Sequence, residues 1–206
     1  MKPYYVSIKD EFQEEKDFYF EELNKKDWKR LRESSELFLV HAYSHLFKIP
    51  PAGYEVFGDT DYKIKYSQFY LNLAIGLELL LKSILLKKGK KISFNPEKTI
   101  PFGQIIEKHL TTIFPKLTET TLEEIKYTLK LVNLRRNNIA HRSKRSRDSY
   151  LHEHKFSYIT LYIYEKFFYG ENQELTALLL KSIDRSRVTQ GSDFKPPRIK
   201  PRSLRG

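Results

Sequence analysis

One short segment combines residue types that can move a proton and bind a phosphate. Arg136 and Asn137 are followed, after three further residues, by His141. A histidine titrates close to neutral pH, so it can take the proton from a ribose 2′-hydroxyl or return one to a leaving oxygen. An arginine stays charged and binds phosphate through a rigid fork of N–H donors. Together these side chains predict phosphodiester transfer on RNA without a metal.

Cations surround this histidine in the sequence. No carboxylate occurs between residues 135 and 147, and the stretch contains Arg135, Arg142, Lys144, Arg145 and Arg147. We expect these five side chains to hold the RNA backbone; a solvated basic loop is the alternative. The whole chain of 206 residues has a formal net charge of +11, which also favours a polyanionic partner such as RNA.

The elements that must position these residues are predicted to be helices. Apolar residues recur at three- and four-residue steps over 28–47, after Asp27 as N-cap, and again over 66–88, 103–114, 118–140, 150–169 and 174–183. No strand or hairpin pattern competes with them. The sequence therefore predicts an all-α bundle.

The predicted helix 66–88 is apolar on two sides, which is typical of a central helix in a bundle. Glu78 and Lys82 lie near its middle, where each charge would cost about 2.5 to 3.5 kcal/mol inside a bilayer. We therefore expect core packing and no membrane partner. Because the two residues are four apart, an ion pair within the helix is expected.

Helical geometry limits how the predicted site can work. At about 100° per residue, Arg136 and His141 diverge by about 140° around an unbroken helix, so they cannot both contact one phosphate from a single chain. Either the helix unwinds near Asn137 and Asn138, or a second copy of the chain completes the site. Tyr127, Leu131 and Leu134 form an apolar stripe on the His141 face that would suit a homodimer interface.

This segment resembles the signature of the HEPN family, which is an arginine, usually a polar residue next, and a histidine after four to six intervening residues. Arg136, Asn137 and His141 fit its shortest form. The helix before it adds to the resemblance, since HEPN domains have an apolar helix carrying Glu and Lys there, matched here by Ala74, Glu78, Leu81, Lys82 and Leu85. The resemblance covers roughly residues 24–170.

The resemblance implies a HEPN-like up-and-down bundle of about five to six helices that dimerises and cleaves RNA as a metal-independent endoribonuclease. His141 would transfer the proton, Arg136 would bind the phosphate and Asn137 would orient either, with Glu78 and Lys82 in support and no cofactor. Such domains resemble toxins and host-defence nucleases, which implies an antitoxin or regulatory protein as a further partner.

Several structural interpretations of the same residues stay open. Arg136 can be paired with Glu78 at a helix crossing, His141 can cap a helix C-terminus, and Asn137 can belong to a fraying helix end. Two alternatives to a nuclease also remain: a non-catalytic HEPN-like interaction module, and a basic RNA-binding protein without chemistry.

The chain is expected to have an acidic N-terminal segment over 1–22, one helical domain over 23–183 and a basic, flexible tail over 184–206. The absence of cysteine and of a secretory signal pattern favours a cytoplasmic protein. His41 and His45 have the spacing of metal ligands, but packing is favoured and no metal site is expected. His152, Glu153 and His154 are expected on a helix surface.

Overall fold

Seven α-helices, a short 3-10 helix and one pair of short strands build the part of the chain that the computed structural model describes. That part comprises residues 27–49, 60–95, 98–142, 153–191 and 195–204, without the side chains of 60–63, 93–98, 141–142 and 190. The elements are α2 (Trp28–Phe47), α3 (Thr60–Lys87), β1 (Ser93–Asn95), β2 (Lys98–Thr99), α4 (Phe102–Lys108), α5 (Leu110–Ile113), α6 (Glu119–Arg142), α7 (Glu153–Phe168), α8 (Gln173–Gln190) and η3 (Arg202–Leu204). The prediction of an all-α bundle is confirmed.

Helix α2 begins and ends as its sequence predicts. The Asp27 carboxylate accepts a hydrogen bond from the Arg30 backbone N–H at 3.1 Å, so the predicted N-cap is confirmed. Its buried face carries Leu39, Ala42 and Tyr43, which pack against α3. The two helices approach closely at Gly76, whose carbonyl oxygen accepts the Ser35 hydroxyl at 2.8 Å.

Helix α3 lies at the centre of the packing. It contacts α2, α5, α6 and α7. The stripe that includes Leu73, Leu77 and Leu80 is buried, whereas Leu71, Ile75 and Leu79 on another side are only partly buried. Ile64–Lys87 is long and apolar enough to cross a membrane by length and composition alone, yet 67% of its most apolar window is buried inside the bundle. Core packing therefore accounts for most of the apolar composition of this helix.

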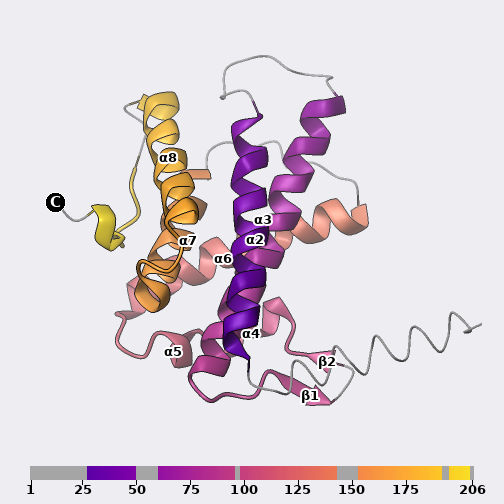
Figure 1. Ribbon diagram of the computed structural model, residues 1–206, viewed down its shortest axis with the longest axis vertical. Coiled ribbons are helices and arrows are strands. Elements are labelled where there is room, and N and C mark those ends of the chain that lie inside the picture. Colours follow the sequence, from indigo (N-terminus) through magenta and orange to yellow (C-terminus); the bar gives the residue numbers. More distant parts are fainter. Residues whose placement is uncertain (1–26, 50–59, 96–97, 143–152, 192–194, 205–206) are drawn as a thin grey trace, which may run out of the picture.

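Figure 1 shows how the helices are arranged. Helices α2 and α3 lie side by side, α7 and α8 form a second pair, and α6 crosses behind them. The first and last helices of the described chain are neighbours, because α2 also contacts α8. The course of α6 across the bundle sets the position of the predicted catalytic segment.

The segment between α3 and α6 differs from its prediction in two ways. Strands β1 and β2 pair antiparallel where no strand was expected, since Ile92 and Ile100 on either side are buried and joined by a 2.7 Å backbone hydrogen bond. Two or three paired residues are too few to show a period of two in sequence. The helix predicted over 103–114 is split at His109, so α4 and α5 form in its place.

The predicted boundary at residue 183 and the flexible tail beyond it are wrong for the described residues. Helix α8 continues to Gln190, and Arg185 within it donates hydrogen bonds to the carbonyl oxygens of Leu46 and Ile49 at 2.8 and 2.6 Å. Residues 195–204 pack on the bundle as well, because prolines exclude a helix there but do not prevent burial. The acidic segment 1–22 lies outside the described residues.

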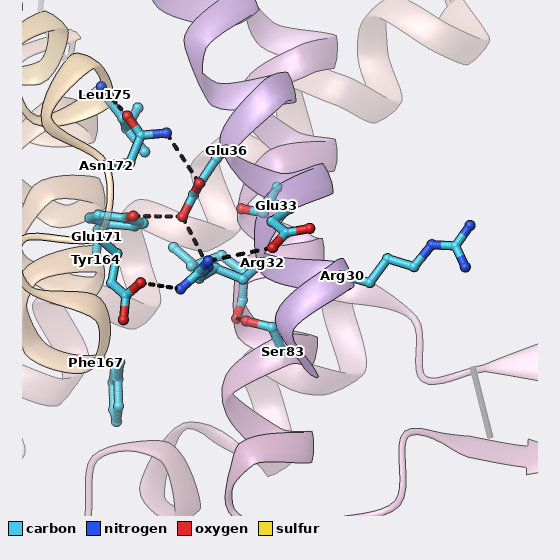
Figure 2. A network of polar contacts seen from close by, with 12 residues as sticks. Arg30, Arg32, Glu33, Glu36, Ser83, Tyr164, Phe167, Glu171, Asn172 and Leu175 are labelled. Carbon is cyan, nitrogen blue, oxygen red and sulfur yellow. Dashed lines mark hydrogen bonds and ion pairs between the residues drawn. The ribbon is translucent and has the colours of Figure 1, made fainter. Parts of the chain in front are cut away.

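A network of polar contacts ties α2 to the turn between α7 and α8 (Figure 2). The Arg32 guanidinium forms ion pairs with Glu36 at 3.2 Å and Glu171 at 2.6 Å. The Glu36 carboxylate also accepts the Tyr164 hydroxyl at 2.6 Å and the Asn172 amide at 3.1 Å. Both carboxylate oxygens of Glu36 are used within the network, which marks it as a structural connection between helices.

Candidate nucleic-acid cleavage site on helix α6

Glu78 is the centre of a polar cluster where α6 crosses α3. One of its carboxylate oxygens accepts the Lys82 ammonium at 2.7 Å, and the other accepts Nη1 of Arg136 at 2.9 Å. Lys82 also donates to the Thr99 hydroxyl at 2.9 Å, so β2 contributes to the cluster. We call Glu78, Lys82, Thr99 and Arg136 the Glu78 cluster. Both expected ion pairs of Glu78 are therefore present.

Arg136 is held from two directions. Besides its bond to Glu78, its Nε donates to Oδ1 of Asn137 at 3.3 Å. The side chain keeps 28% of its surface exposed, and Nη2 makes no hydrogen bond to the described residues. The guanidinium is thus oriented by its neighbours and retains one donor group for a ligand from solvent.

Helix α6 stays intact through the signature segment. Its α-helical hydrogen bonding extends over Glu119–Arg142, past Asn137 and Asn138, so the alternative in which the helix unwinds there is wrong. The backbone of His141 is helical, and its side chain lies outside the described atoms. In an intact helix His141 and Arg136 project about 140° apart, and one chain does not bring them to a single phosphate.

The predicted faces of α6 are confirmed where side chains are described. Ile125, Leu129 and Val132 on the Arg136 face are fully buried. On the His141 face, Tyr127 is 68% and Leu134 is 55% exposed, while Leu131 packs partly against the core. Helix α6 therefore carries large apolar side chains on the side that the bundle does not cover.

Arg135 is not a surface residue, and its predicted role in holding the RNA backbone is wrong. It is 5% exposed, and its guanidinium lies 4.9 Å from the ring centre of Tyr70 and 5.3 Å from that of Phe156. It also donates a hydrogen bond to the Tyr70 hydroxyl. At its position on the helix, Arg135 points between α3 and α7, where aromatic faces stabilise a buried cation.

The other predicted RNA contacts remain predictions. Arg142 is the last residue of α6, with its side chain outside the described atoms, and Lys144, Arg145 and Arg147 lie outside the described residues, as does His152. The expected site thus has a described half, consisting of the Glu78 cluster and Asn137. Its other half consists of His141 and the basic residues that follow.

Glu153 and His154 are buried, so their predicted place on a helix surface is wrong. His154 is 3% exposed, and its Nε2 donates to the carbonyl oxygen of Lys195 at 3.2 Å. Burial raises the pKa of the Glu153 carboxyl to about 7, although Arg185 and Arg135 act in the opposite direction. The nearly continuous apolar run that follows in α7 was the signal in the sequence for this burial, because a helix that is apolar on all sides is buried together with its polar residues.

The two histidines of α2 do not form a metal site with their described neighbours. His41 is exposed rather than packed, while burial and then the positive charges of Lys48, His41 and Lys65 lower the pKa of His45. Within the described ranges, no three His, Asp or Glu side chains gather closely enough to hold a metal ion.

Comparison with known proteins identifies no relative: no family model, no curated protein and no solved structure matches the chain. The resemblance to HEPN domains therefore rests on the residues of α3 and α6 named above.

Proposed function

We propose that this protein is an endoribonuclease of the HEPN type that cleaves RNA at a site formed by two copies of the chain. The observation that carries the proposal is the intact helix α6. Its Arg136 is oriented by the Glu78 cluster, and its opposite face exposes Tyr127 and Leu134 before His141. A two-fold contact between α6 helices would bring His141 of one copy toward Arg136 of the other.

The proposed chemistry uses the substrate's own 2′-hydroxyl as nucleophile. His141 takes the hydroxyl proton, the 2′-oxygen attacks the adjacent phosphorus, and the bond to the 5′-oxygen breaks. A histidine, in its protonated form, returns a proton to that leaving oxygen. Arg136 stabilises the charge on the phosphorane. The products are a 2′,3′-cyclic phosphate and a 5′-hydroxyl, with no metal required.

The Glu78 cluster supports the role of Arg136. An arginine fixed before substrate binds has less side-chain entropy to lose, and electrostatic stabilisation is greatest when the donors are already oriented. Asn137 adds a second restraint through its 3.3 Å bond to Nε. Lys82, which is 8% exposed, acts on Glu78 and not on the RNA.

The decisive experiment measures cleavage of single-stranded RNA by purified protein in excess EDTA. We expect His141→Ala to lose about two to four orders of magnitude in rate, the usual contribution of a general acid or base. RNA carrying 2′-O-methyl groups should bind and stay whole. His41→Ala, which removes an exposed histidine from α2, is the matched control and should cleave at the rate of the natural chain.

Two outcomes would overturn the proposal. Undiminished cleavage by His141→Ala would assign the activity to another site, and products with 5′-phosphate ends would exclude attack by the 2′-hydroxyl. A toxin or host-defence role, with a protein that restrains the nuclease, is part of the proposal through the family resemblance alone.

A further inference from the structure

Residues 195–204 form a strap, non-helical up to η3, that contacts both α6 and α7 (yellow in Figure 1). Pro197, Ile199 and Pro201 are buried against the bundle, and Ile199 is 7% exposed. Arg198 and Lys200, which lie between them, are charged and exposed, as are Lys195 before them and Arg202 after them. From Pro197 to Arg202 the strap therefore alternates buried apolar residues with exposed cations, as extended backbone does.

Backbone groups hold the strap in place. The carboxylate of Glu165, itself 3% exposed, accepts the backbone N–H groups of Arg202 at 2.5 Å and Ser203 at 3.4 Å. Glu124 of α6 accepts the backbone N–H of Arg198 at 3.2 Å, and His154 donates to the Lys195 carbonyl oxygen. Glu124 and Glu165 thus bind the main chain of the strap at Arg198 and Arg202, and the residues Arg198 and Arg202 are exposed.

The spacing of the cations suits a repeating anion. Arg198 and Lys200 are two residues apart, which corresponds to about 6 to 7 Å along extended chain, and Arg202 follows at the start of η3. A single small anion would need convergent donors, whereas a row of charges of one sign matches a polymer with regularly spaced phosphates.

An exposed aromatic ring lies at one end of this row. Tyr169 is 63% exposed, and the Arg202 guanidinium is 5.4 Å from its ring centre. Exposed aromatic rings next to a row of cations are the usual platform on which unpaired bases stack. An acidic protein segment would use the cations and would leave the ring without a role.

We propose that the strap is a binding track for the backbone of single-stranded nucleic acid, with Tyr169 stacking on a base at its end. The choice of RNA over DNA rests on the proposed function. The strap lies along α7, the helix whose Phe156 ring contacts Arg135, the neighbour of Arg136. The strap would hold nucleotides away from the scissile bond.

Binding of a 2′-O-methylated single-stranded RNA, which is not cleaved, tests the strap at several salt concentrations. The test variant replaces four cations and keeps every backbone donor of the strap: Lys195→Gln, Arg198→Gln, Lys200→Gln and Arg202→Gln. Its affinity should fall, and the slope of log K against log salt should become shallower by about 0.7 for each phosphate that the variant no longer neutralises. A control of equal charge change uses exposed lysines elsewhere: Lys90→Gln, Lys91→Gln, Lys108→Gln and Lys116→Gln. The control should keep most of the slope.

The stacking residue gives a second test that does not depend on charge. Tyr169→Leu should weaken RNA binding about tenfold, and Tyr169→Phe should restore it because the ring is kept. This exposed position leaves the core intact, so the pair of variants also serves if the fourfold variant does not fold.

Equal salt slopes for the fourfold variant and the natural chain would overturn the strap proposal, even with cleavage unchanged. Polyglutamate that competes as strongly as the RNA, and whose binding is abolished by the same four substitutions, would overturn it in favour of an acidic protein partner. If RNA binding depends on the strap and His141→Ala cleaves at the natural rate, the strap proposal is supported and only the proposed cleavage site is overturned.

Discussion

Glu78 shows how a single carboxylate can prepare a site before any substrate binds. It accepts Lys82 and Arg136 on separate oxygens, and Lys82 is held further by Thr99. The partly exposed Arg136 is thereby fixed by a more deeply placed pair on α3. Under the proposed function Arg136 has both a structural and a substrate-binding role, because Glu78 binds Nη1 while Nη2 makes no hydrogen bond to the described residues.

Glu153 links the stability of the bundle to pH. Its pKa in the folded chain, about 7, lies above the ordinary value of 4.5, so the folded state keeps the proton after the unfolded state has lost it. The contribution of Glu153 to the free energy of unfolding is fully present below about pH 4.5 and is lost as pH rises through about 7. Relative to the natural chain, Glu153→Gln should gain on the order of 3 kcal/mol in unfolding free energy between pH 4 and pH 8.

Urea unfolding at a series of pH values measures this difference. Glu174→Gln, an exposed position in the first turn of α8, is the control and should follow the pH profile of the natural chain. A Glu153→Gln profile parallel to that of the natural chain would show that the buried carboxyl does not titrate in this range.

At the scale of the elements, the contact between α2 and α3 depends on a missing side chain. A Cβ placed on Gly76 would lie 2.7 Å from Cγ and 2.8 Å from Cδ2 of Leu39, and 3.2 Å from its backbone nitrogen. The two helices would have to separate to accommodate it. We expect Gly76→Ala to destabilise the bundle by about 1 to 3 kcal/mol, the usual cost of overpacking a core, measured by urea unfolding.

Gly103 in α4 provides the comparison for this prediction. Its added Cβ would meet only the Asn133 amide at 3.5 Å, an ordinary contact. Gly103→Ala should therefore be neutral or stabilise by up to about 1 kcal/mol, because alanine favours helix. Equal effects of the two substitutions would mean that helix propensity, and not close packing, governs both sites.

The sequence predicted the long helices well and the irregular segments poorly. Apolar periodicity located α2, α6 and α7 to within a few residues, and helical geometry predicted the burial of Ile125, Leu129 and Val132. The β1–β2 pair is too short to show a period of two, and the strap is held by contacts with residues distant in sequence, which local patterns do not encode. Arg135 was misplaced for a related reason, since charge alone does not reveal that aromatic rings from α3 and α7 surround it.

At the scale of the whole molecule, we predict a homodimer through α6. Tyr127 and Leu134 are large, exposed and on one face, and a charge there would oppose burial. Leu134→Glu should shift the protein from dimer to monomer at micromolar concentration, as measured by light scattering. Val188→Glu, at an 84% exposed position on α8, is the control and should stay dimeric. A natural chain that is monomeric throughout would remove the composite site.

Mixed dimers give the activity readout of the same prediction. One subunit would carry Arg136→Ala and the other His141→Ala, so that one of two composite sites keeps both residues. Cleavage should return in the mixture and disappear again when both subunits also carry Leu134→Glu. Mixtures as inactive as either parent variant would indicate that each site uses residues from one chain.

The network that joins α2 to the α7–α8 turn also has a consequence for the timing of synthesis. Arg32 and Glu171 are 139 positions apart, and Arg185 caps the Leu46 carbonyl across the same separation. A ribosome that adds about 5 to 20 residues per second needs about 7 to 28 seconds to cover that interval. During this time the nascent α2 can pair Arg32 with its own Glu36, but it lacks Glu171 and the group that caps its C-terminal end. A translation pause before residue 171 would therefore prolong a state in which α2 is not yet packed against α8. A chaperone that binds short charged helices would act on the same state.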